Sequence, residues 1–382
     1  RYRERENHIS SDSWPIYISL QKDGILFKMR RTQDLPDKES ATMFFQDCKL
    51  SHQAQITGIS HSVKEIFPPD LLDLTQLQKE ANIRYGYTAS EVYDIAQSLY
   101  EKKLISYPRT SSRYLTEDVF DSLSPIMARL LSWELFPAAK GTGGIDISSL
   151  SRHVINAEKA NVHHAIIITG IRPGNMSEKE MQVYRLVAGR MLETFMAPCR
   201  IETTNVEAVC AAQHFKAEQT RIIEAGWHDV FMRSDMVPKS GYSVNELPEV
   251  EKSDTLNVCG CNMVHKKQLP VNPFTDAELV EYMEQKGLGT VSSRTNIIRT
   301  LVNRKYIRYS GRYIIPTPKG MFTYETIRGK KIADTLLTAD WEKQLAGLES
   351  GMITGQDFLN RIRTLAKEMT DDIFNTYSTK EE

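Results

Sequence analysis

A tyrosine and an arginine two residues apart, Tyr107 and Arg109, are the residues whose types and spacing most directly suggest chemistry. Pro108 between them favours an extended conformation at Tyr107 and cannot donate to a sheet ladder, so we expect an exposed bend. Residues two apart in an extended segment share a face, which places a phenol beside a planar guanidinium. A phenolate can attack phosphorus to give a phosphotyrosine, while a guanidinium binds the non-bridging oxygens. The pair therefore indicates phosphodiester chemistry, although nearly all of the 16 tyrosines must be packing or surface residues.

Positive charge is concentrated in one segment. The chain as a whole has 48 Lys and Arg against 49 Asp and Glu, which argues against a uniformly basic nucleic-acid-binding protein. Between positions 294 and 331 a single acid, Glu325, stands among the basic residues Arg294, Arg299, Arg304, Lys305, Arg308, Arg312, Lys319, Arg328, Lys330 and Lys331. Aromatic residues alternate with them. A charged run is usually a solvated face, but cations interleaved with aromatic rings suit a polyanion whose bases can stack.

Helices are predicted just before the Tyr–Arg pair. Periodicity predicts one helix over Leu74–Tyr85 and a second over Ala89–Glu101, and Thr88 with Glu91 forms a capping box for the second. A short strand over Leu104–Tyr107 is expected to follow. Helix, turn, helix and strand are the outline of a helix-turn-helix or winged-helix unit.

The segments on either side alternate apolar and polar residues with the period of two that is typical of strands. Residues 9–65 and about 200–258 follow this pattern, and Asp23-Gly24 is a hairpin-turn signal. We expect one β-rich layer that the chain leaves for the helical segment and then re-enters.

A second pair of predicted helices lies beyond this layer. Thr275 and Glu278 form another capping box, and Ser292 or Ser293 is expected to cap the next helix. A hairpin over residues 306–315 and helices from residue 339 to the end complete the expected elements.

Length and composition exclude several classes. The 382 residues suffice for two or three domains, and 41% hydrophobic with 25% charged residues are typical of a globular protein. The longest uncharged apolar run, Ala165–Ile171, is too short to span a bilayer, and no export signal is found. The five cysteines, including Cys259-Gly-Cys261, show no zinc-ligand spacing and indicate a reducing cytoplasm. No ATP-binding Gly-x-x-x-x-Gly-Lys-[Ser/Thr] loop is present, and Gly141-Thr-Gly-Gly144 is interpreted as a mobile loop.

Four motifs, in order, carry a family resemblance. The first, around the tyrosine, consists of two stretches, Pro68-Pro-Asp-Leu-Leu-Asp-Leu-Thr-Gln-Leu-Gln-Lys-Glu-Ala81 and Ala96-Gln-Ser-Leu-Tyr-Glu-Lys-Lys-Leu-Ile-Ser-Tyr-Pro-Arg-Thr110. Downstream follow Val162-His-His-Ala-Ile-Ile-Ile-Thr169, Lys286-Gly-Leu-Gly-Thr-Val-Ser-Ser-Arg-Thr-Asn-Ile-Ile298 and Leu337-Thr-Ala-Asp-Trp-Glu-Lys-Gln-Leu345. They resemble the active-site region, the histidine motif, the Gly-x-Gly DNA-gate segment and the C-terminal core helix of type IA DNA topoisomerases, nearest the topoisomerase III branch. Jointly these motifs are highly specific and cover most of the chain.

The resemblance implies roles at the matching positions. Tyr107 aligns with the nucleophile, Arg109 with the arginine that stabilises the transition state, and His163 with the histidine that contacts the scissile phosphate. His164 is the adjacent alternative. Without the resemblance, His163 would be interpreted as an ordinary core or surface residue.

The downstream helix is expected to contact DNA. Ser292, Ser293 and Arg294 would offer hydroxyls, helix N-terminal amides and a guanidinium to the DNA backbone, and plain helix capping by the serines is compatible with this role. The basic residues that follow, Arg299, Arg304 and Lys305, belong to the same expected DNA-binding set.

The sequence departs from the family pattern at two positions. Ser111 stands where the family usually has an aspartate after the arginine, and Ile168 stands where its histidine motif usually has a proline. The first departure removes a carboxylate near the nucleophile, so the rate of cleavage or its metal dependence could differ from the family norm.

A larger departure concerns the metal. In the family a Toprim domain precedes the segments found here and supplies an acidic Mg²⁺-binding cluster with a glutamate and a lysine beside the tyrosine. No Asp-x-Asp-x-Asp pattern occurs in this sequence, which starts at Arg1, so we expect an excerpt of a longer enzyme. Because an unperturbed tyrosine has a pKa of about 10, Tyr107 without those groups would lack a proton acceptor and metal-assisted positioning. We expect this chain alone to bind single strands and to cleave poorly or not at all.

The expected architecture is multidomain α+β, with the core of a type IA topoisomerase. Residues 1–66 and 199–270 are expected to form a β-rich arch, residues 67–198 a helical, winged-helix-like catalytic domain, and residues 271–382 a helical DNA-gate domain. By resemblance, the intact enzyme cuts one DNA strand, holds the 5′ phosphate on Tyr107, passes another strand and reseals, with Mg²⁺ and without ATP. We expect a monomer whose partner is DNA, mainly single-stranded, with no membrane contact.

Rival functions remain open. A non-catalytic winged-helix DNA-binding protein could keep the fold and the basic face. A relaxase would need a clustered histidine triad, which the nine histidines do not show in their spacing. A tyrosine recombinase would link the 3′ phosphate, so the polarity of the covalent adduct separates it from the family named above.

Overall fold

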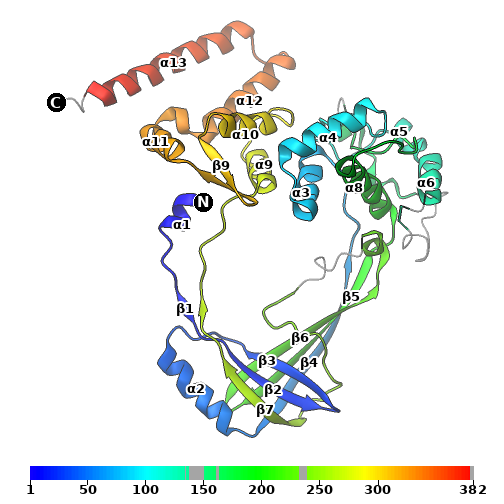
Figure 1. Cartoon of the computed structure of the whole chain (residues 1–382), viewed down its shortest axis with the longest axis vertical. Coiled ribbons are helices and arrows are strands. Elements are labelled where there is room, and N and C mark those ends of the chain that lie inside the picture. Colours follow the sequence, from blue (N-terminus) through cyan, green and yellow to red (C-terminus); the bar gives the residue numbers. More distant parts are fainter. Residues whose placement is uncertain (134, 137–149, 161–162, 232–238, 379–382) are drawn as a thin grey trace.

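The elements of the protein are arranged as a ring. The computed structural model describes residues 1–133, 135–136, 150–160, 163–231 and 239–378. A β-barrel lies at one end of the ring and two helical regions lie next to each other at the opposite end (Figure 1). Among the described residues, no helix combines the length and the apolar character needed to cross a membrane. The predicted loop at Gly141–Gly144, and Val162 of the histidine motif, lie outside the described residues.

Six antiparallel strands close the barrel in the order β2-β3-β6-β5-β4-β7. Alternate residues of β2 (Ile16, Ile18 and Leu20) are fully buried inside it, as expected for a strand with one face toward a core. The predicted layer built from two distant segments is confirmed, because strands from both complete the same barrel. The bounds are β2 Ile16–Lys22, β3 Ile25–Arg31, β4 Gln53–Ile66, β5 Cys199–Cys210, β6 Gln213–Glu224 and β7 Thr255–Met263.

The turn between β2 and β3 confirms the hairpin prediction. Asp23 and Gly24 both have positive φ, 50° and 82°, as a two-residue turn between right-twisted strands requires.

A helix inside the first strand-rich segment corrects the sequence-based prediction of strands throughout residues 9–65. Helix α2 spans Lys38–Leu50, and Asp37 caps it by accepting a hydrogen bond from the Ser40 amide at 2.7 Å. Its buried residues, Ala41 and Cys48, lie seven positions apart on one face, which is a helical spacing. This face packs against the barrel and stabilises the helix.

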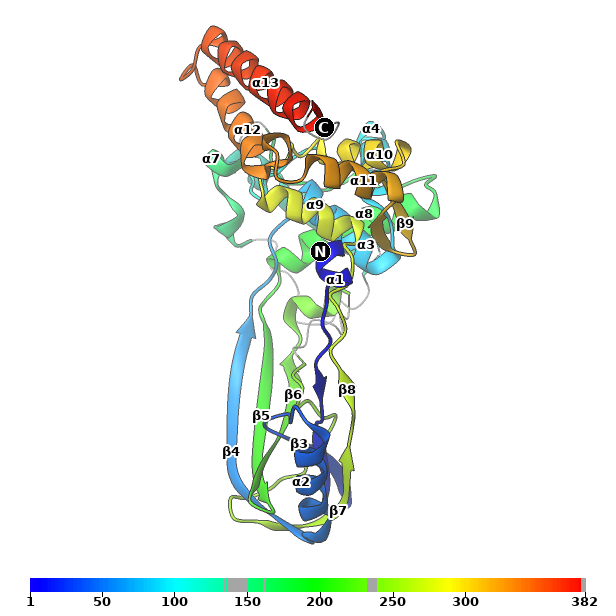
Figure 2. The same ribbon diagram turned by 90° about the vertical axis from the view of Figure 1, so that its left-hand side faces the viewer.

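Two connections complete the ring. On one side β4, β5 and β6 extend well beyond the barrel as a ribbon, in which the β4–β5 pairing ends at Ile66 and Cys199 and the β5–β6 pairing at Arg200 and Glu224 (Figure 2). On the other side, β1 (Asp12–Ser13) pairs with β8 (Lys266–Lys267). Helix α1, Tyr2–Glu6, precedes β1 and is tied to the C-terminal helices by an ion pair between Arg3 and Glu325.

The first helical region, residues 67–198, contains the Tyr–Arg pair; we call it the tyrosine region. The predicted helices are confirmed with the same bounds, as α3 Leu74–Tyr85 and α4 Ala89–Glu101. Both hydrogen bonds of the Thr88–Glu91 capping box are present. These helices pack against α8, and the remaining elements are α5 Glu117–Asp121, α6 Leu123–Ser132, a 3₁₀ turn Arg152–Val154, α7 Ala157–Ala160 and α8 Glu178–Phe195. A 3₁₀ turn, Gly226–Val230, packs on α8 after β6.

The second helical region, residues 271–378, we call the C-terminal region. The capping box of Thr275 and Glu278 is present, and the predicted hairpin turns at Gly311 with a φ of 59°. Helices also occur in the predicted C-terminal stretch, so these predictions are confirmed for the described residues. The bounds are α9 Asp276–Gln285, α10 Arg294–Asn303, β9 Ile307–Ser310, β10 Tyr313–Pro316, α11 Pro318–Ile327, a 3₁₀ turn Lys331–Ala333, α12 Thr335–Glu349 and α13 Gly355–Ser378.

One local prediction was wrong, and another is confirmed only in the position of the residue. Leu104–Tyr107 does not form a strand, since only an isolated bridge joins Ile105 to Ile168. Ser293 occupies the N-cap position of α10, but its hydroxyl accepts from the Thr290 amide at 2.8 Å and makes no cap hydrogen bond.

Candidate active site

Tyr107 is held by a network between two distant segments. Ser106 donates its amide to the Ile167 carbonyl at 2.8 Å and its hydroxyl to the Ala165 carbonyl at 3.1 Å. The Ile167 amide in turn donates to the Ser106 hydroxyl at 3.0 Å. The residue just before the tyrosine is therefore fixed to the histidine motif.

The phenol of Tyr107 lies against an imidazole. The ring centroids of Tyr107 and His163 are 4.3 Å apart, with 41° between the ring planes. Tyr100, on α4, meets the same tyrosine edge-on at 5.4 Å. Tyr107 is half-buried and His163 is exposed, and Thr110 donates its hydroxyl to the His163 carbonyl at 3.0 Å. The structure thus brings together two of the three predicted catalytic residues and leaves them open to solvent.

Arg109 is held against α4. Its Nη2 donates to the Gln97 side-chain oxygen at 3.1 Å, and its guanidinium carbon lies 4.9 Å from the centre of the Tyr93 ring. Its Nε is buried and has no hydrogen-bond partner among the described residues. The structure shows no contact between Arg109 and Tyr107 themselves among the described residues; both instead contact the same helix.

Tyr93, Gln97 and Tyr100 were not identified from the sequence as part of the site. They lie at i, i+4 and i+7 of α4, on one face of the helix. Tyr100 is 39% exposed. The sequence shows the helical spacing of these residues, but it does not show that the segment with Tyr107 and Arg109 packs on this face of the helix.

His164 does not share the position of His163. Its Nδ1 lies 2.7 Å from the carbonyl oxygen of Ala165, within its own segment. The imidazole that contacts Tyr107 is that of His163.

The segment after Arg109 is tied to the start of α3. The Arg113 guanidinium donates from Nε to Asp73 at 2.6 Å, and the Asp73 carboxylate also accepts from the Gln76 amide at the helix N-terminus. Ser111, at the position where a carboxylate was expected by resemblance, is exposed. Among the described residues there is no group of three or more His, Cys, Asp or Glu side chains placed to hold a metal ion. The residues present therefore do not fit a Mg²⁺ site.

Five of the six predicted DNA-binding residues divide into two groups, and the sixth, Ser293, is half-buried and accepts from the Thr290 amide. Arg294 is buried, where Nη1 donates to Glu284 at 3.2 Å and Nε to the Leu288 carbonyl at 3.3 Å. Arg299 donates to Ser90 and forms an ion pair with Asp94 at 2.8 Å. These two guanidiniums are engaged within the protein, whereas the side chains of Ser292, Arg304 and Lys305 are exposed.

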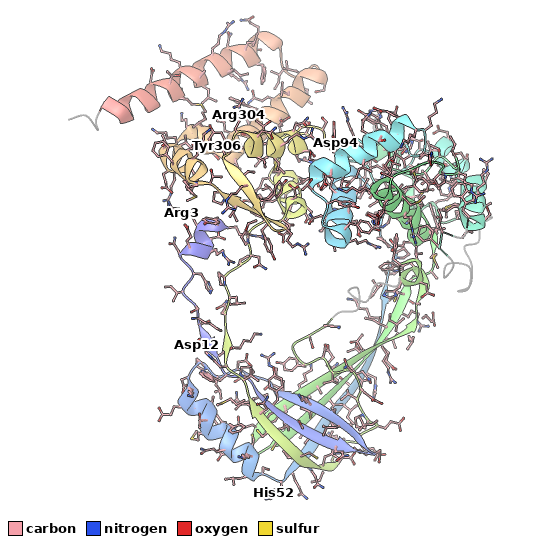
Figure 3. All side chains as sticks on the ribbon, in the orientation of Figure 1. Arg3, Asp12, His52, Asp94, Arg304 and Tyr306 are labelled. Atoms are coloured by element: carbon pink, nitrogen blue, oxygen red, sulfur yellow. The ribbon has the colours of Figure 1, made fainter. Side chains whose placement is uncertain are left out.

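Arg299 belongs to a seam of contacts between α3 and α4 of the tyrosine region and α9 and α10 of the C-terminal region. Figure 3 shows Asp94 at the side of α4 that faces the C-terminal region. Gln78 donates to the Thr295 hydroxyl at 2.9 Å in a buried position, and Lys79 pairs with Glu281 at 2.8 Å.

A buried carboxylate completes the seam. Asp276 Oδ2 accepts from the Ala89 amide at the start of α4 and from the Tyr309 hydroxyl, both at 2.9 Å. Burial raises the pKa of the Asp276 carboxyl and of the Tyr309 hydroxyl above their usual values.

Comparisons with known proteins give a consistent result. A family model described as DNA topoisomerase matches residues 1–360. The chain is similar to DNA topoisomerase 3 of Bacillus licheniformis, with 31% identity over 344 residues that make up 84% of this chain and 47% of the relative. DNA topoisomerase 3 of Bacillus subtilis is 30% identical over 355 residues, 86% of this chain and 48% of the relative. The chain thus spans about half the length of these relatives.

A solved structure is similar in fold. Full-length topoisomerase I from Thermotoga maritima aligns with a TM-score of 0.74 and 22% sequence identity. The alignment covers 97% of this chain and 60% of that chain.

Proposed function

This chain belongs to the type IA DNA topoisomerase family, nearest the topoisomerase III branch, and on that basis we propose that it carries the DNA-cleaving tyrosine of such an enzyme. The full-length protein would cut one DNA strand transiently, pass another strand through the break and reseal it.

The observation that carries the proposal is the set of side chains around the Tyr107 phenol. The ring centroids of the half-buried Tyr107 and the exposed His163 lie 4.3 Å apart. This closeness supports the proposal that the phenol attacks the scissile phosphate and that the imidazole contacts the same phosphate. Arg109, fixed on α4, supplies the guanidinium for the charge that develops on the phosphate oxygens.

The proposed reaction is a transesterification. The Tyr107 oxygen forms a bond to phosphorus, the bond between phosphorus and the 3′ oxygen breaks, and the 3′ oxygen takes up a proton while the phenol loses one. The 5′ phosphate stays on the tyrosine, and attack by the 3′ hydroxyl reverses the step. One phosphodiester is exchanged for another, so resealing needs no ATP.

Among the described residues no group of three or more His, Cys, Asp or Glu side chains is placed to hold Mg²⁺. For the full-length protein we keep the prediction that Mg²⁺ is bound by carboxylates elsewhere in that protein. It follows that this chain alone should bind single-stranded DNA without efficient cleavage.

We assign the three parts of the ring accordingly. The barrel and its ribbon would be the arch, residues 67–198 the winged-helix-like catalytic domain, and residues 271–382 the DNA-gate domain. The exposed Ser292, Arg304 and Lys305 would contact the DNA backbone. Arg294 and Arg299 would instead hold the second helical pair in place, because their guanidiniums are already paired within the protein. All five cysteines are free, which suits the reducing cytoplasm, and we expect a monomer.

The test is covalent trapping. The natural full-length protein that contains this chain would be incubated with Mg²⁺ and a single-stranded oligonucleotide labelled at either end, beside Tyr107→Phe and the matched control Tyr100→Phe. We expect an adduct that retains the 3′-labelled fragment in the parent and in Tyr100→Phe, and no adduct in Tyr107→Phe.

The other outcomes identify the rivals. An adduct with the 5′-labelled fragment would indicate recombinase polarity and contradict the proposal. DNA binding without any adduct in the full-length protein would favour the non-catalytic DNA-binding function and remove the role of Tyr107.

A further inference from the structure

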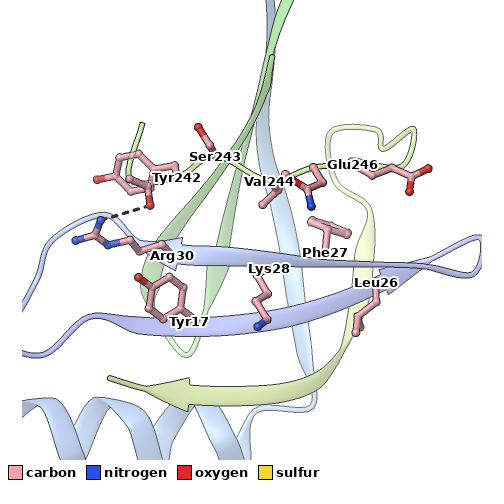
Figure 4. Close-up of a pocket in the computed structure, with 11 residues that line it drawn as sticks. Tyr17, Leu26, Phe27, Lys28, Arg30, Tyr242, Ser243, Val244 and Glu246 are labelled. Atoms are coloured by element: carbon pink, nitrogen blue, oxygen red, sulfur yellow. Dashed lines mark hydrogen bonds between the residues drawn. The ribbon is translucent and has the colours of Figure 1, made fainter. Parts of the chain in front are cut away.

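A pocket on the barrel, far along the chain from Tyr107, has no role in the function proposed above. It has a volume of about 440 Å³, which is within the range of small-ligand sites. Strands β2 and β3 form one wall, and the segment 241–246 forms the other (Figure 4). In Figure 1 this segment lies on the side of the barrel that faces the helical regions across the ring.

The pocket exists because β3 and β6 pair only briefly. Their register contains two pairs, Arg30 with Lys216 and Arg31 with Phe215. The next part of β6 pairs instead with the segment after Gly241, since the Glu218 amide donates to the Tyr242 carbonyl at 2.9 Å and the Val244 amide to the Glu218 carbonyl at 2.8 Å. The wall opposite β3 is therefore held by backbone hydrogen bonds.

The aromatic ring of this wall is fixed at its far end as well. The Tyr242 hydroxyl donates to the Thr32 carbonyl at 2.9 Å. Because the Tyr242 ring is held at both the backbone and the hydroxyl, it gives the pocket a fixed wall, and little ordering of this wall opposes the binding of a ligand.

Arg30 anchors the pocket and is not free to bind a ligand by charge alone. Its Nη2 pairs with Asp34 at 2.6 Å, its Nη1 donates to the Gly241 carbonyl at 3.4 Å, and its guanidinium lies 5.6 Å from the centre of the Tyr242 ring. A Cβ at Gly241 would lie 2.3 Å from Nη1, so a larger residue here would displace the Arg30 guanidinium from this position.

The groups left for a ligand are an aromatic ring, an ammonium and acceptors. Tyr17, half-buried, lies opposite Arg30 on the outer face of the β2–β3 hairpin. On the same face, Lys28 is exposed, and its ammonium has no hydrogen bond or ion pair with any other described residue. Across the pocket, the Asn245 and Glu246 side chains are exposed at the rim.

Together these groups match the parts of a nucleotide. An aromatic ring stacks on a base, and an unpaired ammonium donates hydrogen bonds to a phosphate. A carboxylate or amide oxygen can accept a hydrogen bond from the amino group of a base. Leu26, 59% exposed beside them, adds apolar surface for the sugar or base.

We propose that this pocket binds one nucleotide of single-stranded DNA, with the base against Tyr17 and the phosphate at Lys28. The inference rests on the proposed function for its ligand class, but it assigns a second DNA contact, on the barrel, that is separate from the site of cleavage. A strand held at both places would be fixed across the ring.

The experiment uses the full 382-residue chain with Tyr107→Phe, so that cleavage cannot interfere. A single-stranded oligonucleotide carrying 5-iododeoxyuridine would be photocrosslinked to it, and the linked peptide identified by mass spectrometry. Affinity would be measured by fluorescence anisotropy as a function of salt for the parent, for Tyr17→Leu with Lys28→Gln, and for Lys49→Gln on α2 as a control of equal charge.

We expect crosslinks in peptides containing Tyr17 or Tyr242. We also expect about a fivefold or larger loss of affinity in the double variant, in line with the loss of one stacked base, and a salt slope reduced by about one. The control should bind within about 1.5-fold of the parent, because one distant charge adds little.

Crosslinks confined to other regions, or a double variant that binds like the parent, would overturn the proposal. Neither result would affect the cleavage test at Tyr107, so the two proposals fail separately. Tyr17 and Lys28 both lie on the outer face of the hairpin, and an unchanged circular dichroism melt would confirm that the double variant is folded. If the double variant is not folded, the identity of the crosslinked peptides alone decides whether the pocket binds DNA. An acidic peptide that displaces the oligonucleotide from this pocket would indicate a protein ligand and would also overturn the proposal.

Discussion

The guanidinium of Arg109 is hydrogen-bonded to the side chain of Gln97, with 3.1 Å between Nη2 and Oε1. The bond joins the arginine of the Tyr–Arg pair to the helix that also contacts Tyr107, so α4 determines where both side chains lie. Gln97 is a positioning residue under the proposed reaction, because it acts on the phosphate only through Arg109.

Gln97→Leu should slow covalent adduct formation by the full-length protein by about 10- to 100-fold, since a small misplacement of a reacting group costs that much. The dissociation constant for single-stranded DNA should change less than about twofold, because Arg109 would contribute mainly to the transition state. Gln97→Glu keeps the acceptor and should retain most of the rate. Glu101→Ala removes the side chain that accepts from the Gln97 amide nitrogen and serves as the control. A Gln97→Leu variant that forms the adduct as fast as the parent would refute the positioning role of Gln97.

The lowered pKa of Glu180 makes the free energy of unfolding depend on pH. Its hydrogen bonds with Lys102 and Ser98, and with the Ser177 amide, lower the pKa of this carboxyl to about 2. A carboxyl with a lowered folded pKa stabilises the fold above its unfolded pKa, and this contribution is lost as the pH falls through the folded value. Glu180→Gln should therefore reduce the free energy of unfolding by about 1–2 kcal/mol at pH 7, and the difference should shrink between pH 4.5 and 2.

Urea titrations at pH 7, 4 and 3, followed by circular dichroism, would measure this difference. A deficit of equal size at every pH would mean that the Glu180 charge contributes nothing and that the variant acts only through packing.

The raised pKa of Asp276 makes the free energy of unfolding depend on pH in the opposite direction. Burial raises the pKa of its carboxyl above the ordinary 3.8, so the folded state holds the proton more tightly than the unfolded state. The stability from this group is complete below pH 3.8 and is lost as the pH rises through the folded pKa. Asp276→Asn cannot ionise and keeps an acceptor for Ala89 and Tyr309, so it should be more stable than the parent at neutral pH.

The advantage of Asp276→Asn should disappear at acid pH. Thermal unfolding of parent and variant across pH 4 to 8 would show it as a difference in Tm that grows with pH. A variant less stable than the parent at pH 8 would show that the charged hydrogen bonds outweigh the cost of burial.

At Gly189, inside α8, the neighbouring side chains leave no room for a Cβ. An alanine is normally preferred over glycine in a helix, but a Cβ here would lie 2.2 Å from the Phe231 ring and 3.0 Å from Phe136. Gly189→Ala should cost about 2–3 kcal/mol, as overpacked cores do. Gly174→Ala, where nothing lies within 4 Å, is the matched control and should be nearly neutral. Equal melting temperatures for the two variants would contradict the crowding.

Local signals predicted much of the tyrosine region. Helices α3 and α4 have the predicted bounds because a capping box at Thr88 and a glycine at position 86 with φ 73° mark the boundaries within the sequence itself. Helix α2 was missed because its buried face packs on strands that come from elsewhere in the chain, and the strand-like segments around it dominated the pattern.

The sequence named three candidate catalytic residues, and their role stays a prediction; the residues that hold them in place could not be predicted. Tyr107, Arg109 and His163 follow from motifs, whereas Gln97 and Tyr93 become relevant only when the segment after α4 folds back onto that helix. The pairing of Arg299 with Asp94, 205 positions away, likewise depends on tertiary structure. A basic residue in a sequence shows its charge but not the carboxylate that already neutralises it.

The seam between α3–α4 and α9–α10 differs from every other part of the ring. Elsewhere the ring is continuous polypeptide, since β4 and β5 run from the barrel to the tyrosine region and the chain beyond β7 runs to the C-terminal region. Within the part of the chain that the structure describes, the two helical regions are joined to each other by noncovalent contacts such as Arg299 with Asp94. A covalent cross-link across the seam would close the protein into a permanent loop. A circular molecule enclosed by that loop would then be linked to it like one ring of a catenane to the other, inseparable without breaking a bond.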